Sequence, residues 1–131
     1  MTKTEIIDII AERIARKEGF YKAKSLAARN FNPGNLRKWG TLKTHKGFAV
    51  FTDAAAGWRA LKRQISLNIG RELSFYTFFA GQRDKNDEVI PGGYYGYAPA
   101  KDNNNPLDYA IFVAKPFKVN YKTVIKDLIK K

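Results

Sequence analysis

The chain contains no cysteine and only one histidine, His45, so neither disulfide bonds nor a metal site built from thiolates or histidines can hold it together. We expect no metal and no cofactor. The 131 residues are 44% hydrophobic and 14% aromatic, a composition typical of a globular chain and not of a disordered one. At this length we expect a single domain with one hydrophobic core, spanning residues 1–131.

The charge balance points to a negatively charged partner. Lys and Arg number 24 against 12 Asp and Glu, which gives a formal net charge of +12. Such a charge suits DNA and the anionic polymers of a cell wall equally well, because neutralising phosphates does not depend on sequence. No zinc finger or other base-reading motif is present, so we expect any contact with nucleic acid to be non-specific.

No apolar run approaches the roughly 20 residues needed to cross a bilayer, so no transmembrane segment is predicted. The first residues include Glu5 and Asp8, which do not fit a basic leader followed by an apolar stretch. We therefore expect no signal peptide in the chain.

The hydrophobic pattern predicts mostly helices. Apolar residues at spacings of three and four indicate a helix over residues 2–17, with Gly19 as its end. Residues 21–37 show no period and contain a turn cluster, which predicts an ordered loop. The remaining expected elements are a hairpin over 39–51, helices over 52–69, 73–79, 105–114 and 120–131, and a surface insertion over 82–95. The expected fold class is α+β with a mainly helical core.

Glu18 is the acidic residue with the least ordinary position. It closes the first predicted helix, where a carboxylate faces the negative end of the helix dipole. Its neighbours Phe20 and Tyr21 favour the protonated form that a general acid requires. The alternative is a solvated side chain paired with a neighbouring lysine.

Amide side chains gather in two segments, residues 29–37 and 95–106, and the second segment also contains tyrosines. Amides and aromatic rings are the groups that bind sugar hydroxyls and N-acetyl groups. The same residue types also form turns and helix caps, and this alternative stays open.

Taken in order, the motifs resemble those of the lysozyme-like phage proteins, which occur in virions and prophages and are often labelled only as structural proteins. The resemblance covers roughly residues 10–119. Its motifs are EGFY from Glu18, SLAARN from Ser25, NPGNLR from Asn32, GFAVF from Gly47, AGWRAL from Ala56, YAP from Tyr97 and YAIFV from Tyr109.

The resemblance implies a lysozyme-like fold, with a small β-hairpin beside a cleft, that is related to phage lysozymes and soluble lytic transglycosylases. It implies peptidoglycan glycan as the substrate and Glu18 as the catalytic acid. The residues expected to bind the sugar chain are Asn32, Asn35, Arg37, Tyr97, Asn104 and Tyr109. Four of them, Asn32, Asn35, Tyr97 and Tyr109, are expected to converge with Glu18 on one groove. The sequence departs from the family at Phe31, where another Asn is common, and at residues 82–95, which lengthen a usually short connection.

The chemistry implied by the resemblance has two forms. A hydrolase normally uses two carboxylates, whereas a lytic transglycosylase uses one, which first protonates the glycosidic oxygen and then accepts the proton of the sugar's own 6-hydroxyl. Because Glu18 alone stands out, the sequence favours the transglycosylase. The alternative is a non-enzymatic, basic virion protein with a lysozyme-like fold.

We accordingly expect a virion-associated protein that acts on the bacterial cell wall. Its expected partners are peptidoglycan, other virion proteins and, through charge alone, nucleic acid.

Overall fold

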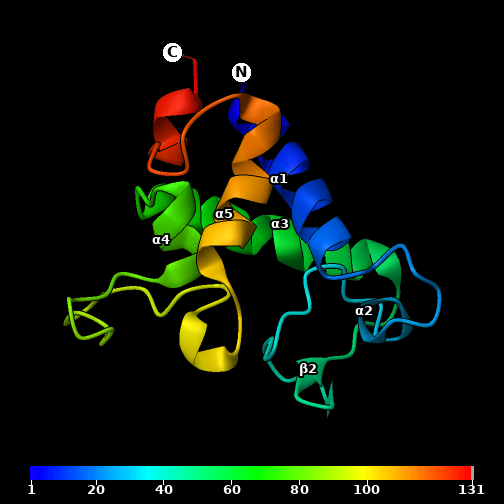
Figure 1. The fold of residues 1–131 in the computed structure, drawn as a ribbon. Helices are drawn as coiled ribbons and strands as arrows, with labels where there is room; N and C mark the ends of the chain where they lie inside the picture. Colours follow the sequence, from blue (N-terminus) through cyan, green and yellow to red (C-terminus); the bar gives the residue numbers. More distant parts are fainter. Residues whose placement is uncertain (131) are drawn as a thin grey trace. The chain divides into compact units, whose positions relative to one another are not determined.

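A computed structural model describes residues 1–130. The chain divides into two compact units: an N-terminal unit of residues 3–67, and a C-terminal unit that combines residues 1–2 with the chain from residue 68 onward. The architecture is mainly helical α+β, as predicted, with five α-helices and one two-stranded antiparallel hairpin in the described residues (Figure 1). The single domain expected over residues 1–131, with its insertion at 82–95, stays a prediction.

Helix α1 (Lys3–Lys17) opens the N-terminal unit and confirms the helix predicted over residues 2–17. Its apolar side, with Ile6, Ile10 and Ile14, is fully buried. The helix ends in a Schellman motif, in which Phe20 N–H donates to the Ala15 carbonyl (3.0 Å) and Gly19 N–H donates to the Arg16 carbonyl (3.1 Å). Gly19 takes the left-handed conformation that this motif needs (φ 77°). Glu18 is therefore the C-cap residue of α1.

A second, very short helix, α2 (Leu26–Arg29), lies inside the stretch that we expected to be loop throughout, and that expectation was wrong there. Ser25 caps it by accepting a hydrogen bond from the Ala28 N–H (3.1 Å). Four residues make one turn, which is too short for a hydrophobic period to be read from the sequence.

The predicted hairpin is confirmed, with strands β1 (Thr44–His45) and β2 (Phe48–Ala49). Lys46 and Gly47 both have positive φ (52° and 86°), which is the geometry of a type I′ turn. The following helix, α3 (Ala54–Gly70), confirms the helix predicted over residues 52–69 and begins after Asp53, whose Oδ1 accepts the Ala56 N–H at 2.8 Å.

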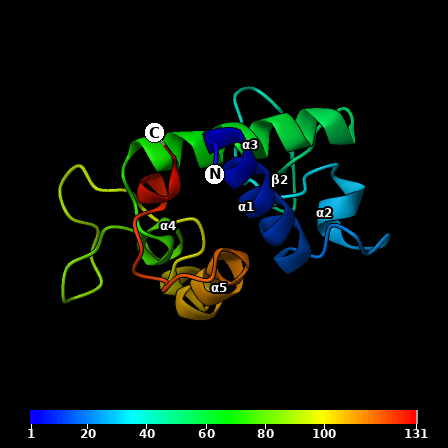
Figure 2. The same ribbon diagram turned by 90° about the horizontal axis from the view of Figure 1, so that it is seen from above.

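The C-terminal unit is built on α4 (Phe75–Ala80) and α5 (Pro106–Ala114), which confirm the helices predicted over residues 73–79 and 105–114. Ser74 and Thr77 form a capping box at the start of α4, and Asn105 caps α5. The two helices pack side by side (Figures 1 and 2), and the rings of Phe79 and Tyr109 stack with their centroids 4.2 Å apart.

The segment 82–95 contains no helix. It extends from α4 as a loop in both views (Figures 1 and 2), with one isolated bridge between Arg83 and Val89. The Arg83 side chain is only 7% exposed and donates to three backbone carbonyls, those of Ala80 (2.8 Å), Asp87 (2.8 Å) and Tyr95 (2.9 Å). One buried guanidinium thus ties both ends and the middle of the loop together.

Three short 3-10 helices complete this unit: η1 (Ala100–Asp102), η2 (Lys115–Phe117) and η3 (Ile125–Leu128). The short helix expected over residues 120–131 is present only as η3, and the expectation was wrong for the rest of the described part; Lys131 lies outside the described residues. The physical reason is that the backbone here bonds to the start of α4 instead, as in Phe75 N–H to the Thr123 carbonyl (3.1 Å) and Ile125 N–H to the Leu73 carbonyl (3.1 Å).

Among residues 1–130, no helix has both the length and the apolar character needed to pass through a bilayer.

Candidate functional site

Glu18 lies at the C-cap of α1 and is half-buried. Its Oε1 accepts a hydrogen bond from Nδ2 of Asn35 at 3.1 Å, so the expected catalytic acid and one of the expected sugar-binding residues are in contact. Asn35 has a positive φ of 47°, a conformation that Asn tolerates better than most residues. The conformation of this turn therefore places the side-chain amide of Asn35 within hydrogen-bonding distance of the Glu18 carboxyl group.

Asn32 has a different role in the same turn. It is fully buried, and its amide bonds only to backbone: Nδ2 donates to the carbonyls of Leu36 (2.9 Å) and Ala49 (3.0 Å), and Oδ1 accepts the Leu36 N–H (2.9 Å). These bonds tie the turn to strand β2 and fix the position from which Asn35 reaches Glu18.

The segment that follows Glu18 is anchored by aromatic contacts. Phe20 packs edge-on against Trp58 of α3 (centroids 5.5 Å apart) and against Tyr21 (5.7 Å). The backbone on both sides of Glu18 is therefore restrained, by the end of α1 before it and by the packing of Phe20 after it.

A second carboxylate on α1, Glu12, is bound on both sides. The Tyr21 hydroxyl donates to Oε2 and the Arg16 guanidinium donates to Oε1. The hydrogen bond from Tyr21, followed by that from Arg16, lowers the pKa of Glu12 despite its partial burial. Partial burial of the phenol, together with the bond to Glu12, raises the pKa of Tyr21 to about 12.

The two remaining prominent residues of the segment point elsewhere. Arg37 is exposed, and its guanidinium lies over the ring of Phe48 with its carbon 4.9 Å from the ring centroid. Phe31, which departs from the family pattern, is 44% exposed and has a positive φ of 51°.

The other predicted sugar-binding residues belong to the C-terminal unit. Tyr97 and Tyr109 lie together, with their ring centroids 6.4 Å apart, and Tyr109 is only 3% exposed. Asn104 is exposed, and its Nδ2 lies 3.5 Å from the Pro99 carbonyl oxygen and 3.4 Å from that of Asp102. The structure thus brings together Glu18 with Asn35 in one unit and Tyr97 with Tyr109 in the other. Convergence of all of them on one groove stays a prediction.

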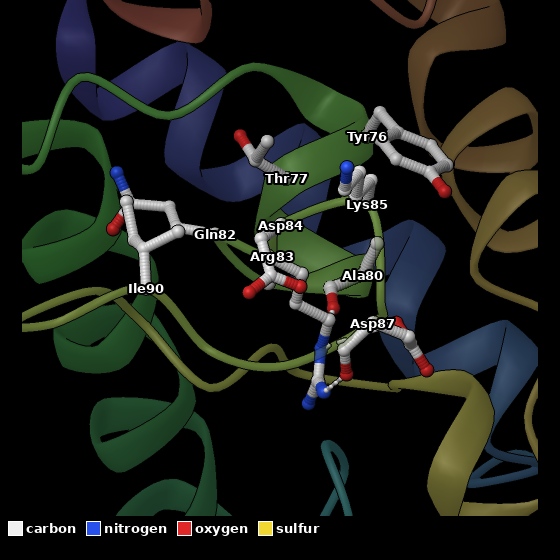
Figure 3. A pocket seen from close by; sticks show the side chains of 10 residues that line it. Tyr76, Thr77, Ala80, Gln82, Arg83, Asp84, Lys85, Asp87 and Ile90 are labelled. Carbon is white, nitrogen blue, oxygen red and sulfur yellow. Dashed lines mark hydrogen bonds and ion pairs between the residues drawn. The ribbon is translucent and has the colours of Figure 1, made fainter.

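Sequence reasoning missed a surface hollow in each unit. In the C-terminal unit, a hollow of about 570 Å³ lies where α4 passes into the loop 82–95. Figure 3 shows the Arg83 guanidinium beside Asp87 at this hollow, with Gln82 and Ile90 on another side. The Arg83 guanidinium already donates to three backbone carbonyls. We therefore assign its role at this hollow to holding the loop.

The N-terminal unit has an apolar groove of about 430 Å³. Trp39 and two arginines of α3, Arg59 and Arg63, contribute to its lining. The sequence did contain a signal for it, because arginines four residues apart lie on one face of a helix.

No group of three or more potential metal ligands occurs among residues 1–130. Comparisons with family models, with curated proteins and with solved structures each find no match to this chain.

Proposed function

We propose that the protein cleaves the glycan strand of peptidoglycan, with Glu18 as the general acid and base, and that its mainly helical α+β chain has a lysozyme-like fold. The observation that carries this proposal is the hydrogen bond from Asn35 to Glu18 at the end of α1. A neutral amide fixes the plane of the carboxyl group without neutralising it by an opposite charge.

Three other acidic residues of the N-terminal unit, Asp8, Glu12 and Asp53, use their carboxylates in contacts that stabilise the fold. Asp8 pairs with Lys62 of α3 (3.0 Å), Glu12 binds Arg16 and Tyr21, and Asp53 caps α3. This supports a mechanism with one carboxyl group, in which Glu18 protonates the glycosidic oxygen and then takes the proton from the 6-hydroxyl of the same sugar. The oxygen of that hydroxyl bonds to the anomeric carbon as the glycosidic C–O bond breaks, and the neighbouring sugar leaves with the proton from Glu18 as a free hydroxyl. This gives a 1,6-anhydro end and consumes no water.

Within this proposal the predicted sugar-binding residues have distinct tasks. Asn35 orients Glu18, and Asn32 acts through the backbone by holding the turn. Tyr97 offers a ring face to a sugar, whereas Tyr109, only 3% exposed and stacked on Phe79, packs against Tyr97. Asn104 and the exposed Arg37 offer donors for hydroxyl and carboxylate groups. The protein would act on the cell wall as part of a virion.

The test is mass analysis of the soluble fragments released from purified peptidoglycan. A lytic transglycosylase releases fragments with anhydro ends, each lighter by one water molecule, about 18 Da, than the fragment with a reducing end that a hydrolase releases. We expect anhydro ends. Reducing ends alone would keep the substrate but replace the mechanism by hydrolysis, and no release by folded protein would overturn the enzymatic proposal.

A further inference from the structure

The apolar groove of the N-terminal unit is lined by residues that have no part in the proposed cleavage of glycan. Its lining combines apolar side chains with two threonines and two arginines; the lining residues are Trp39, Gly40, Thr41, Leu42, Phe51, Thr52, Ala56, Arg59, Ala60 and Arg63. We call this the Trp39 groove. Its lining contains neither a carboxylate nor an amide side chain.

The charges of the two arginines in the lining are uncompensated. Within the described part of the chain, the side chains of Arg59 and Arg63 form no hydrogen bond, ion pair or ring contact. Both are exposed, and they lie four residues apart on α3, so their like charges face the same side and repel each other. Such an arrangement is stabilised when a negatively charged group binds between or beside them, and guanidinium groups match phosphate geometry particularly well.

The lining of the groove restricts which chemical group can accompany that negative charge. A sugar needs several hydrogen-bonding partners for its hydroxyls, and apart from the arginines this lining offers only the side-chain hydroxyls of Thr41 and Thr52. A nucleobase needs only a flat apolar surface, which an indole ring supplies. Trp39 is partly exposed and makes no contact with another aromatic ring of the described residues, so no other ring is stacked on it.

We propose that the Trp39 groove binds single-stranded nucleic acid without sequence preference, with a base stacked on Trp39 and adjacent phosphates bound by Arg59 and Arg63. The net charge of +12 would draw the strand to the protein, and the groove would hold it. This site is separate from Glu18 and does not depend on the proposed glycan-cleaving activity.

The binding can be followed with a fluorescein-labelled oligothymidylate of about 12 nucleotides, a length within the usual range of site sizes. Oligouridylate of the same length tells whether the sugar of the strand matters. The chain has two tryptophans, so the variant Trp58→Phe leaves Trp39 as the sole tryptophan reporter. We expect the fluorescence of Trp39 to be quenched as the oligonucleotide is added.

Two variants separate the stacking contribution from the charge contribution. Trp39→Ala should weaken binding about 5- to 150-fold, and Trp39→Phe should restore most of it because the ring is kept. The double variant Arg59→Gln/Arg63→Gln should reduce the slope of log affinity against log salt by about 1.4, corresponding to two phosphates. The matched control is Lys22→Gln/Lys24→Gln, which removes the same charge from an exposed loop and should change the slope much less.

Several results would overturn the proposal. One is wild-type affinity of Trp39→Ala, and another is equal weakening by the arginine and lysine double variants, since either would mean that charge alone drives binding. Tighter binding to poly(glycerol phosphate) or to anionic phospholipid vesicles would assign the groove to a different polyanion. A loss of binding in Trp39→Ala supports the proposal only if the circular dichroism spectrum of the variant is unchanged. If that variant does not fold, the affinity of Trp39→Phe and the quenching of Trp39 fluorescence test the proposal instead, and a loss of affinity in Trp39→Phe or an absence of quenching would overturn it. Glu18→Gln should bind the oligonucleotide normally, whatever it does to glycan cleavage.

Discussion

At the scale of single residues, the position of Glu18 follows from the way its helix ends. The Schellman motif needs Gly19 in the left-handed conformation, and this makes the preceding residue the C-cap, with its side chain free to leave the helix axis. Asn35 then fixes the carboxyl group from a turn 17 residues away.

The substitution Glu18→Gln tests this position directly. It keeps the shape and the hydrogen-bonding plane but removes the titrating proton, so we expect release of glycan fragments to fall by about 10²- to 10⁴-fold. The midpoint of thermal unfolding should barely change. Glu5→Gln, the same change at the other end of α1, is the control and should cleave like the wild type. Normal turnover by Glu18→Gln would move the chemistry to another residue.

Glu12 gives a prediction about pH. Its pKa lies below the ordinary value of 4.5 in the folded protein, first through the hydrogen bond from Tyr21, so its stabilising effect is complete above that value and is lost as the pH falls through the lower folded value. Glu12→Gln should therefore be less stable than the wild type by about 0.2–1 kcal/mol near neutral pH, the range of exposed pairs. Urea unfolding at about pH 7 and about pH 3 measures this, and the difference should shrink at the lower pH. A constant difference would show that packing and not charge is responsible.

At the scale of elements, the turn that carries Asn35 rests on α3 at Gly57. A Cβ atom added there would lie 2.0 Å from the Phe31 carbonyl oxygen and 2.8 Å from Cδ of Pro33, so only glycine allows the two backbones to come this close. Packing between α3 and the turn thus depends on one missing side chain.

Gly57→Ala should destabilise the protein by about 1–3 kcal/mol, as expected for overpacking, and should lower glycan cleavage because the turn holding Asn35 shifts. The control lies at the end of the same helix. A Cβ atom added at Gly70 would meet no other atom within 4 Å, so Gly70→Ala should be neutral or slightly stabilising. Chemical unfolding and fragment release measured on both variants separate the two effects, and equal behaviour would contradict the close approach.

The sequence predicts helices whose apolar spacing repeats over several turns or whose first residue is a clear cap, and it does not predict the shorter ones. Helices α1 and α3 span several turns and show their buried stripe, and α5 is marked by the Asn105–Pro106 start. The single turn of α2 has only Ser25 to mark it. The expected C-terminal helix forms only in part because its backbone groups bond to the start of α4, a long-range pairing that local sequence does not encode.

The candidate site divides in the same way. The helix-end position of Glu18 was readable because Gly19 marks the stop. The use of Asn32 was not, since an amide in a turn has the same sequence signature whether it faces solvent or, as here, bonds only to buried backbone.

At the scale of the whole molecule, the excess of positive charge has a measurable consequence. The charge of +12 acts over the Debye length, which falls from about 10 Å at 0.1 M salt to about 3 Å at 1 M. Sedimentation of the protein with purified cell-wall sacculi should therefore decrease steeply over this range, and an uncharged polysaccharide such as dextran, added in excess, should not compete. A flat response would show that contacts other than charge hold the protein on the wall.

The way Arg83 holds the loop 82–95 bears on how this part of the chain can change during evolution. All three hydrogen-bond acceptors of its guanidinium are main-chain carbonyls, which every amino acid possesses, so these three contacts do not depend on which side chains the loop carries at the acceptor positions. Its length is another matter, because adding or removing a residue between Ala80 and Tyr95 would move at least one carbonyl away from the guanidinium. Related chains that keep this arginine should therefore keep the number of residues in the loop even where the residues that accept from the arginine differ.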